Sequence, residues 1–98
     1  MASIGIIATL TVSPGKEAEF EAILAELTAR VHADEPGNLF YGGFHSPDNP
    51  QHYKVLEHYR DKAAADAHFE TVHFKAAGEK LGACLAAPLH LVYLDGFA

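Results

Sequence analysis

The order of apolar and polar residues predicts a strand at the start of the chain and a long helix after it. Between residues 3 and 12 the two kinds alternate, which places every second side chain on the same face of a strand. Ser13 and Pro14 then fit the N-cap and the first position of a helix. Between residues 14 and 33 the apolar residues recur every three or four positions and form one stripe: Phe20, Ile23, Leu24, Leu27 and Val31. Glu35-Pro36-Gly37 is expected to end this helix.

The middle of the chain predicts an antiparallel hairpin. Residues 38–46 and 51–60 each read as a strand, and the short Pro-rich segment between them reads as a turn. In the second of these strands one face carries Tyr53, Val55, Glu57 and Tyr59. The Gly42-Gly43 pair weakens the first strand and indicates a bulge or the close approach of another group.

A second helical region and a last strand complete the expected order. Asp61 can cap a helix from residue 62 to about 70, and the helical pattern continues over residues 71–85, with the Thr71-Val72 junction as the expected place of a break. Pro88 ends this region, and residues 89–95 read as a strand. The order β-α-β-β-α-β predicts an α+β fold of the ferredoxin-like, split βαβ kind, in one domain over residues 1–98. Both helices then cover one face of a four-stranded antiparallel sheet. The other face stays bare and apolar, so we expect a homodimer that packs sheet against sheet.

Composition removes several classes of function. The chain is 49% hydrophobic and 20% charged, as in ordinary folded domains. Seven Lys and Arg stand against 13 Asp and Glu, a net charge of −6, so neither nucleic acid nor an anionic membrane is an expected partner. The single cysteine, Cys84, allows no disulfide within the chain and fits a reducing, cytoplasmic location. The N-terminus does not read as a signal peptide or a membrane span.

Seven histidines are the unusual feature, and their spacing argues against a metal site. His68 and His73 are five residues apart, so on an unbroken helix their side chains diverge by about 140°. His52 and His58 share a strand face but lie roughly 20 Å apart. We therefore expect no metal and, since no dinucleotide or phosphate-loop motif is present, no bound cofactor.

Four stretches resemble the antibiotic biosynthesis monooxygenase (ABM) superfamily, in matching order over nearly the whole chain. They are Ser-Pro-Gly-Lys-Glu at 13–17, Glu35-Pro-Gly-Asn38, Tyr53-x-Val-x-Glu57-x-Tyr59 and Ala67-His68-x-x-Thr71-x-His73-Phe74-Lys75. The resemblance implies a dimeric α+β barrel with a pocket between the sheet and the helices of each subunit. Haem-degrading members are poor matches, because this chain has no Trp and carries Ala8, His68 and Gly78 at the positions of their haem-site residues. The His-rich signature and Asn38 look more like quinol monooxygenases and autoinducer-2-processing relatives.

The candidate site residues follow from these motifs. His68 or His73 could act as a general base, because imidazole titrates near neutrality; convergence of the two requires the helix break. Glu57 could orient a histidine or bind a substrate hydroxyl, or could instead form a structural ion pair. The candidate substrate-binding residues are Asn38, which can also be a simple turn residue, and five aromatic residues that can equally be core: Phe40, Tyr41, Phe44, Tyr53 and Tyr59.

The leading hypothesis is a cofactor-independent monooxygenase that oxidises a small phenol or quinol, with molecular oxygen as co-substrate and a histidine as general base. One alternative is an isomerase or enolisation enzyme for a small hydroxy-ketone. If that substrate is phosphorylated, Lys54, Lys75 or Arg60 would bind the phosphate. A further alternative is a non-catalytic small-molecule-binding or stress-response protein.

Overall fold

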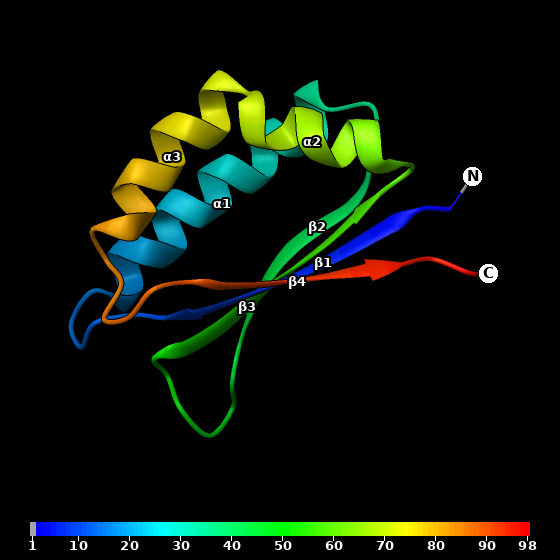
Figure 1. The fold of residues 1–98 in the computed structure, drawn as a ribbon. Helices are drawn as coiled ribbons and strands as arrows, with labels where there is room; N and C mark the ends of the chain where they lie inside the picture. Colours follow the sequence, from blue (N-terminus) through cyan, green and yellow to red (C-terminus); the bar gives the residue numbers. More distant parts are fainter. Residues whose placement is uncertain (1) are drawn as a thin grey trace.

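Four strands form one antiparallel sheet in the computed structural model, which describes residues 2–98. The strands are β1 (Ile4–Thr11), β2 (Asn38–His45), β3 (His52–Tyr59) and β4 (His90–Asp95), in the spatial order β2-β3-β1-β4. The helices are α1 (Glu17–Asp34), α2 (Lys62–Glu70) and α3 (Val72–Gly82). All three lie on one side of the sheet (Figure 1). The fold class, the four-stranded antiparallel sheet and the β2–β3 hairpin are thereby confirmed.

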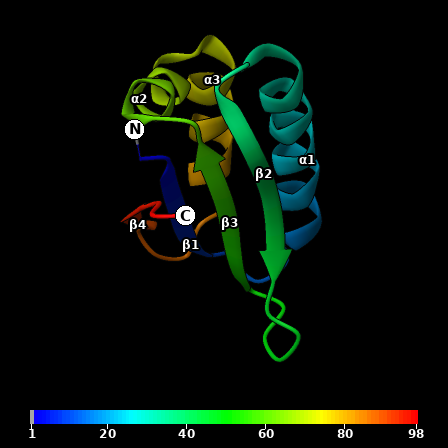
Figure 2. The ribbon, with the colours of Figure 1, turned by 90° about the vertical axis from the view of Figure 1, so that its right-hand side faces the viewer.

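The alternation in β1 and β3 selects the covered face of the sheet, as the sequence predicts. Every second residue of each strand is buried beneath the helices, and the stripe on α1 packs against them. The larger core cluster is Ala8, Leu10, Val12, Phe20, Leu24, Leu27, Val31, Tyr41, Tyr53, Val55, Leu81 and Cys84. A smaller cluster of Ile6, Tyr59 and Ala65 lies where β3 passes into α2. Helix α1 runs beside β2, as Figure 2 shows from the side.

The beginning of α1 differs from the prediction. Ser13 is not its N-cap and Pro14 is not its first residue, because Pro14 and Gly15 form a turn and the helix starts at Glu17. Gly15 has a φ of 89°, a left-handed conformation that glycine adopts without a Cβ clash. Its N–H donates to Glu17 Oε1. The Ser-Pro pair therefore follows the end of β1, and the helix begins only after the turn at Pro14 and Gly15.

The bulge in β2 is not at the Gly42-Gly43 pair. It lies at the start of the strand, where Leu39 is the extra residue between two regular pairs. Gly43 instead marks a close approach: a Cβ placed there would lie 2.6 Å from Leu24 Cδ2 on α1. Of the two readings that the glycine pair allows, the close approach applies to Gly43.

The second helical region is broken where the sequence predicts. Asp61 caps α2 by accepting a hydrogen bond from the N–H of Ala64. Thr71 is extended, with φ −70° and ψ 150°, and its Oγ1 accepts from the N–H of Phe74 to cap α3. Helix α3 ends at Gly82 rather than at residue 85, and Leu85 forms an isolated bridge with Val12.

Within residues 2–98 the second face of the sheet carries no helix, and strand β4 is exposed along its whole length. Large apolar side chains on the open face include Phe40, Phe44, Val92 and Leu94, which are 38–50% exposed. A sheet-to-sheet homodimer would cover them and stays a prediction. No helix within residues 2–98 is long and apolar enough to cross a membrane.

Candidate functional site

The candidate site is a buried cluster of ionisable side chains at the end of the sheet where α1 finishes and α2 begins. Glu57 and Tyr59 come from the covered face of β3. His68 comes from the last turn of α2, and His73 from the first turn of α3. Glu35 follows the last residue of α1 and is its C-cap. The helix break at Thr71 brings the two histidines to this one place.

Glu35 holds both histidines. The Nδ1 atom of His68 lies 2.9 Å from each carboxylate oxygen of Glu35, and Nε2 of His73 lies 2.6 Å from Oε2. His68 is fully buried, whereas the His73 side chain is 17% exposed and lines a groove of about 460 Å³ between α1 and α3. The carboxylate therefore links a buried imidazole to one that reaches the surface.

This contact fixes which nitrogen of His68 can act as a base. A carboxylate only accepts hydrogen bonds, so Nδ1 must carry the hydrogen and donate it to Glu35. In the neutral ring the lone pair is then on Nε2. This atom is buried and has no hydrogen-bond partner among residues 2–98. Burial lowers the pKa of His68, although the nearby Glu35 acts to raise it. The lowered pKa favours the neutral ring.

Glu57 faces the free nitrogen of His68. Its Oε1 lies 3.9 Å from Nε2, which is too long for a hydrogen bond, and accepts a hydrogen bond of 2.7 Å from the Tyr59 hydroxyl. Burial raises the pKa of Glu57 to about 7; the hydrogen bond from Tyr59 lowers it, and the charge of Glu35 raises it further. Burial and the nearby carboxylates also raise the phenol pKa of Tyr59 and Tyr41. The cluster therefore holds a neutral imidazole beside a carboxyl group that titrates near neutrality.

Aromatic rings surround the imidazole of His68. The ring centres of Tyr41, Tyr59, Phe69 and Phe74 lie 4.8–5.6 Å from it. Phe69 and Phe74 are partly buried and lie on either side of the break at Thr71. Two of the predicted aromatic residues, Tyr41 and Tyr59, thus belong to the cluster.

The structure does not bring the other predicted binding residues to His68. Phe40 and Phe44 pair across the sheet with His58 and Lys54 on the open face, where their rings stack at 6.4 Å. The side chain of Asn38 donates to the carbonyl oxygen of Phe40, across the bulge.

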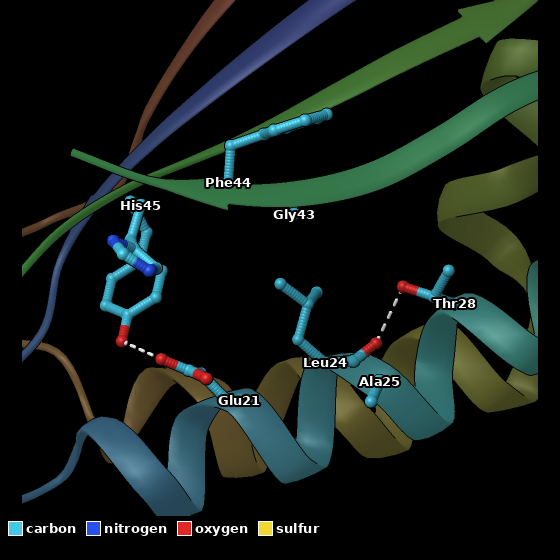
Figure 3. Close-up of a pocket in the computed structure, with 8 residues that line it drawn as sticks. Glu21, Leu24, Ala25, Thr28, Gly43, Phe44 and His45 are labelled. Atoms are coloured by element: carbon cyan, nitrogen blue, oxygen red, sulfur yellow. Dashed lines mark hydrogen bonds between the residues drawn. The ribbon is translucent and has the colours of Figure 1, made fainter. Parts of the chain in front are cut away.

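Tyr53 lies at the far end of β3 and lines an open groove of about 580 Å³ between α1 and β2. Its hydroxyl donates to Glu21 on α1, and the side chains of Leu24, Ala25 and Thr28 line the same groove (Figure 3). Burial is the largest cause that raises the pKa of Tyr53, to about 12, and the hydrogen bond to Glu21 adds to it. The groove is separate from the His68 cluster, because Tyr53 and Tyr59 stand six residues apart on one strand, about 20 Å.

The cations that could hold a phosphate have other partners. Lys54 donates to Thr9, Lys75 pairs with Glu70, and Arg60 pairs with Asp61. Within residues 2–98 no three His, Cys, Asp or Glu side chains are arranged to hold a metal ion.

Glu35 is the residue of the cluster that the sequence reasoning missed, because it was assigned only to the turn that ends α1. A signal was present. The C-terminal end of a helix carries partial negative charge, so an acid placed there is unfavourable unless cationic or donor groups face it. An acid at such a position indicates a partner elsewhere in the chain, here the two histidines.

Comparison with known proteins gives consistent matches. The family model described as "Antibiotic biosynthesis monooxygenase" matches residues 3–80. The protein named "Putative monooxygenase YcnE" from Bacillus subtilis (strain 168) is 34% identical over 85 residues, which cover 87% of this chain and 88% of that protein. The crystal structure of a "putative antibiotic biosynthesis monooxygenase" from Caulobacter crescentus CB15 is 42% identical and covers 99% of this chain and 92% of its own, with a TM-score of 0.95. The structure of PA3566 from Pseudomonas aeruginosa is 28% identical over 100% of this chain and 97% of its own, with a TM-score of 0.88.

Proposed function

Because the chain belongs to the antibiotic biosynthesis monooxygenase family, we propose that it is a cofactor-independent monooxygenase for a small phenol or quinol, with His68 as general base. One observation carries the proposal. Glu35 binds the Nδ1 side of a buried imidazole and leaves the lone pair on an Nε2 atom that has no hydrogen-bond partner among residues 2–98. A carboxylate that orients a histidine in this way is the usual arrangement of a histidine base.

The reaction balances without an external reductant. His68 takes the hydroxyl proton, and the electron pair of the broken O–H bond stays on the substrate as an electron-rich phenolate or quinolate. This anion reduces O2; one oxygen atom enters the ring and the other leaves as water. The two hydrogens of the water are the proton returned from His68 and a second one that the substrate loses as it is oxidised. For a quinol, one quinol and one O2 give one hydroxyquinone and one water, and the substrate supplies all the electrons. The protein's part is to move the proton, to orient the ring and to exclude water.

Access to His68 is through the aromatic rings around it. The imidazole is fully buried, and Phe69 and Phe74 cover it from the two helices that meet at Thr71. We propose that these two side chains move when a substrate enters, and that the substrate ring then lies against Tyr41 and Tyr59. A flat aromatic ring fits such a site better than a branched aliphatic substrate does.

O2 uptake by the purified protein with a panel of quinols and phenols tests the proposal. We expect His68→Gln to lower kcat by roughly 10²–10⁴-fold, the usual contribution of a general base. Glu35→Gln should lower it less, because the ring remains but its orientation is lost. His52→Gln is the matched control, since His52 is exposed at the other end of β3. Absence of uptake across the panel, or full activity of His68→Gln, would refute the function.

The same base could serve the isomerase hypothesis, and hydrogen exchange distinguishes the two. An enolisation enzyme should exchange the substrate's C–H hydrogen with deuterated water under argon, whereas the oxygenase needs O2 to turn over. The phosphorylated form of that substrate has no support from the cluster, because Lys54, Lys75 and Arg60 are bound elsewhere.

A further inference from the structure

Two groups of the cluster face each other without forming a hydrogen bond. His68 Nε2 and Glu57 Oε1 lie 3.9 Å apart with no atom bridging them among the described residues, and both side chains are more than nine-tenths buried. A buried polar atom without a partner costs free energy, so proteins rarely keep one without a use. An oxygen atom about 2.8 Å from both atoms is compatible with this separation.

Building on the proposed role of His68, we infer that the substrate's hydroxyl oxygen binds within hydrogen-bond distance of both atoms, and that Glu57 acts as a neutral acid that donates a hydrogen bond to it. The hydroxyl hydrogen points to Nε2, which can only accept, and the oxygen accepts from the Glu57 carboxyl group. When the O–H bond breaks, the proton forms the N–H bond on Nε2. The electron pair stays on the oxygen, which Glu57 continues to stabilise, and the imidazolium remains paired with Glu35.

The surroundings of Glu57 favour the neutral form that this role requires. Its neighbours in the cluster are Glu35, His68, Tyr41 and Tyr59. Three of these are neutral in the ordinary pH range, because burial raises the pKa of both tyrosines and lowers that of His68. The remaining neighbour, Glu35, is an acid and makes a second carboxylate unfavourable. A carboxylic acid kept neutral by an apolar site is an established kind of oxyanion donor in enzymes.

The role selects a class of ligand. It requires an oxygen that can lose its proton to Nε2 while accepting from Glu57, as a phenol, quinol or enol can. An ether presents no proton to His68, and a carboxylate would bring a second negative charge close to Glu35. The aromatic rings packed around His68 favour the aromatic members of this class.

Binding of 1-naphthol under argon, followed by its fluorescence, tests this inference without the oxidation step. We expect the protein to bind 1-naphthol roughly tenfold more tightly than 1-methoxynaphthalene, which lacks the proton. Binding to the unaltered protein should weaken roughly tenfold between pH 6 and pH 8, as Glu57 ionises. Glu57→Gln keeps a neutral donor, so its binding should not change over this range. Glu57→Leu should bind roughly tenfold more weakly at pH 6.

A matched control is available in the same protein. Glu21 also accepts a hydrogen bond from a tyrosine, but at the far end of the sheet and with its own side chain exposed. Glu21→Gln should therefore follow the unaltered protein at every pH. The inference is wrong if 1-naphthol does not bind, if Glu57→Gln weakens with pH like the unaltered protein, or if binding tightens above pH 7. Tighter binding above pH 7 would mean that ionised Glu57 accepts a hydrogen bond from the naphthol hydroxyl. If the protein takes up O2 but the Glu57 variants bind 1-naphthol like the unaltered protein, the proposed function stands and this inference is wrong. If 1-naphthol binds as expected but no O2 is taken up, this inference stands and the proposed function is wrong.

Discussion

Replacing Glu57 by glutamine should make the protein more stable at alkaline pH and leave its stability nearly unchanged at acid pH. The reason is burial: the folded protein raises the pKa of this carboxyl group from 4.5 to about 7. Between these two values the folded chain holds a proton that the unfolded chain has lost, so stability falls as pH rises. Glutamine cannot ionise, and its side-chain oxygen can still accept the hydrogen bond from Tyr59.

The size of the effect follows from the two pKa values. A difference of one pKa unit corresponds to about 1.4 kcal/mol, so a rise from 4.5 to about 7 amounts to about 3 kcal/mol. The Glu57 contribution to the free energy of unfolding is therefore fully present below pH 4.5 and lost above pH 7. The stability difference between Glu57→Gln and the unaltered protein should grow over this interval and stay constant above it. Groups such as His68, whose lowered pKa gives stability that is lost toward acid pH, affect both proteins equally and cancel in the difference.

Urea unfolding followed by circular dichroism, at a series of pH values from 4 to 9 and one protein concentration, measures this difference. Glu21→Gln is the control, because Glu21 is exposed and its replacement removes no buried charge. A stability difference for Glu57→Gln that is the same at all pH values would contradict the reasoning. A protein destabilised by this substitution at pH 8 would show that ionised Glu57 forms a net favourable interaction in the fold.

Three further predictions concern the scaffold. Gly43→Ala should cost about 1–3 kcal/mol in urea unfolding, because the new Cβ meets Leu24; Gly82→Ala, with open space around it, should cost little and serves as the control. Thr71→Ala should cost about 1 kcal/mol through loss of the α3 cap. It should also lower any oxygenase activity, because the cap holds the break at which the histidines converge. Unchanged activity would contradict this. Leu94→Glu should convert the expected homodimer to monomer in analytical ultracentrifugation, because it puts a charge on the open apolar face; a variant that sediments like the unaltered protein would place the interface elsewhere.

The sequence predicts the elements well where a short-range pattern decides them. The period-two pattern of β1 and β3 gives the covered face, Asp61 caps α2 within a few residues of its partner, and the helix breaks at Thr71. The start of α1 was missed because Gly15, rather than Pro14, decides the backbone there. The short-range rules could not separate a bulge from a close approach at Gly43, since Leu24 approaches it from a different element.

Short-range patterns predict less of the candidate site. His68, His73 and Glu57 were selected by residue type and motif, but their arrangement depends on Glu35, which lies 33 and 38 residues before the two histidines. Its role appears only when the end of α1 and the break between α2 and α3 are placed together. Which aromatic residues reach His68 also depends on the fold. Tyr41 lies beside His68, whereas Phe40, one residue earlier on β2, lies on the open face.

The groups that make up the cluster all lie between positions 35 and 73, whereas β1, most of α1 and β4 contribute only support. The cluster thus comes from one continuous stretch of the chain. Strand β4, exposed on both faces and placed at the sheet edge, can exchange residues without disturbing a single hydrogen bond of the cluster. New contacts introduced on the last strand would therefore leave the residues of the cluster in place.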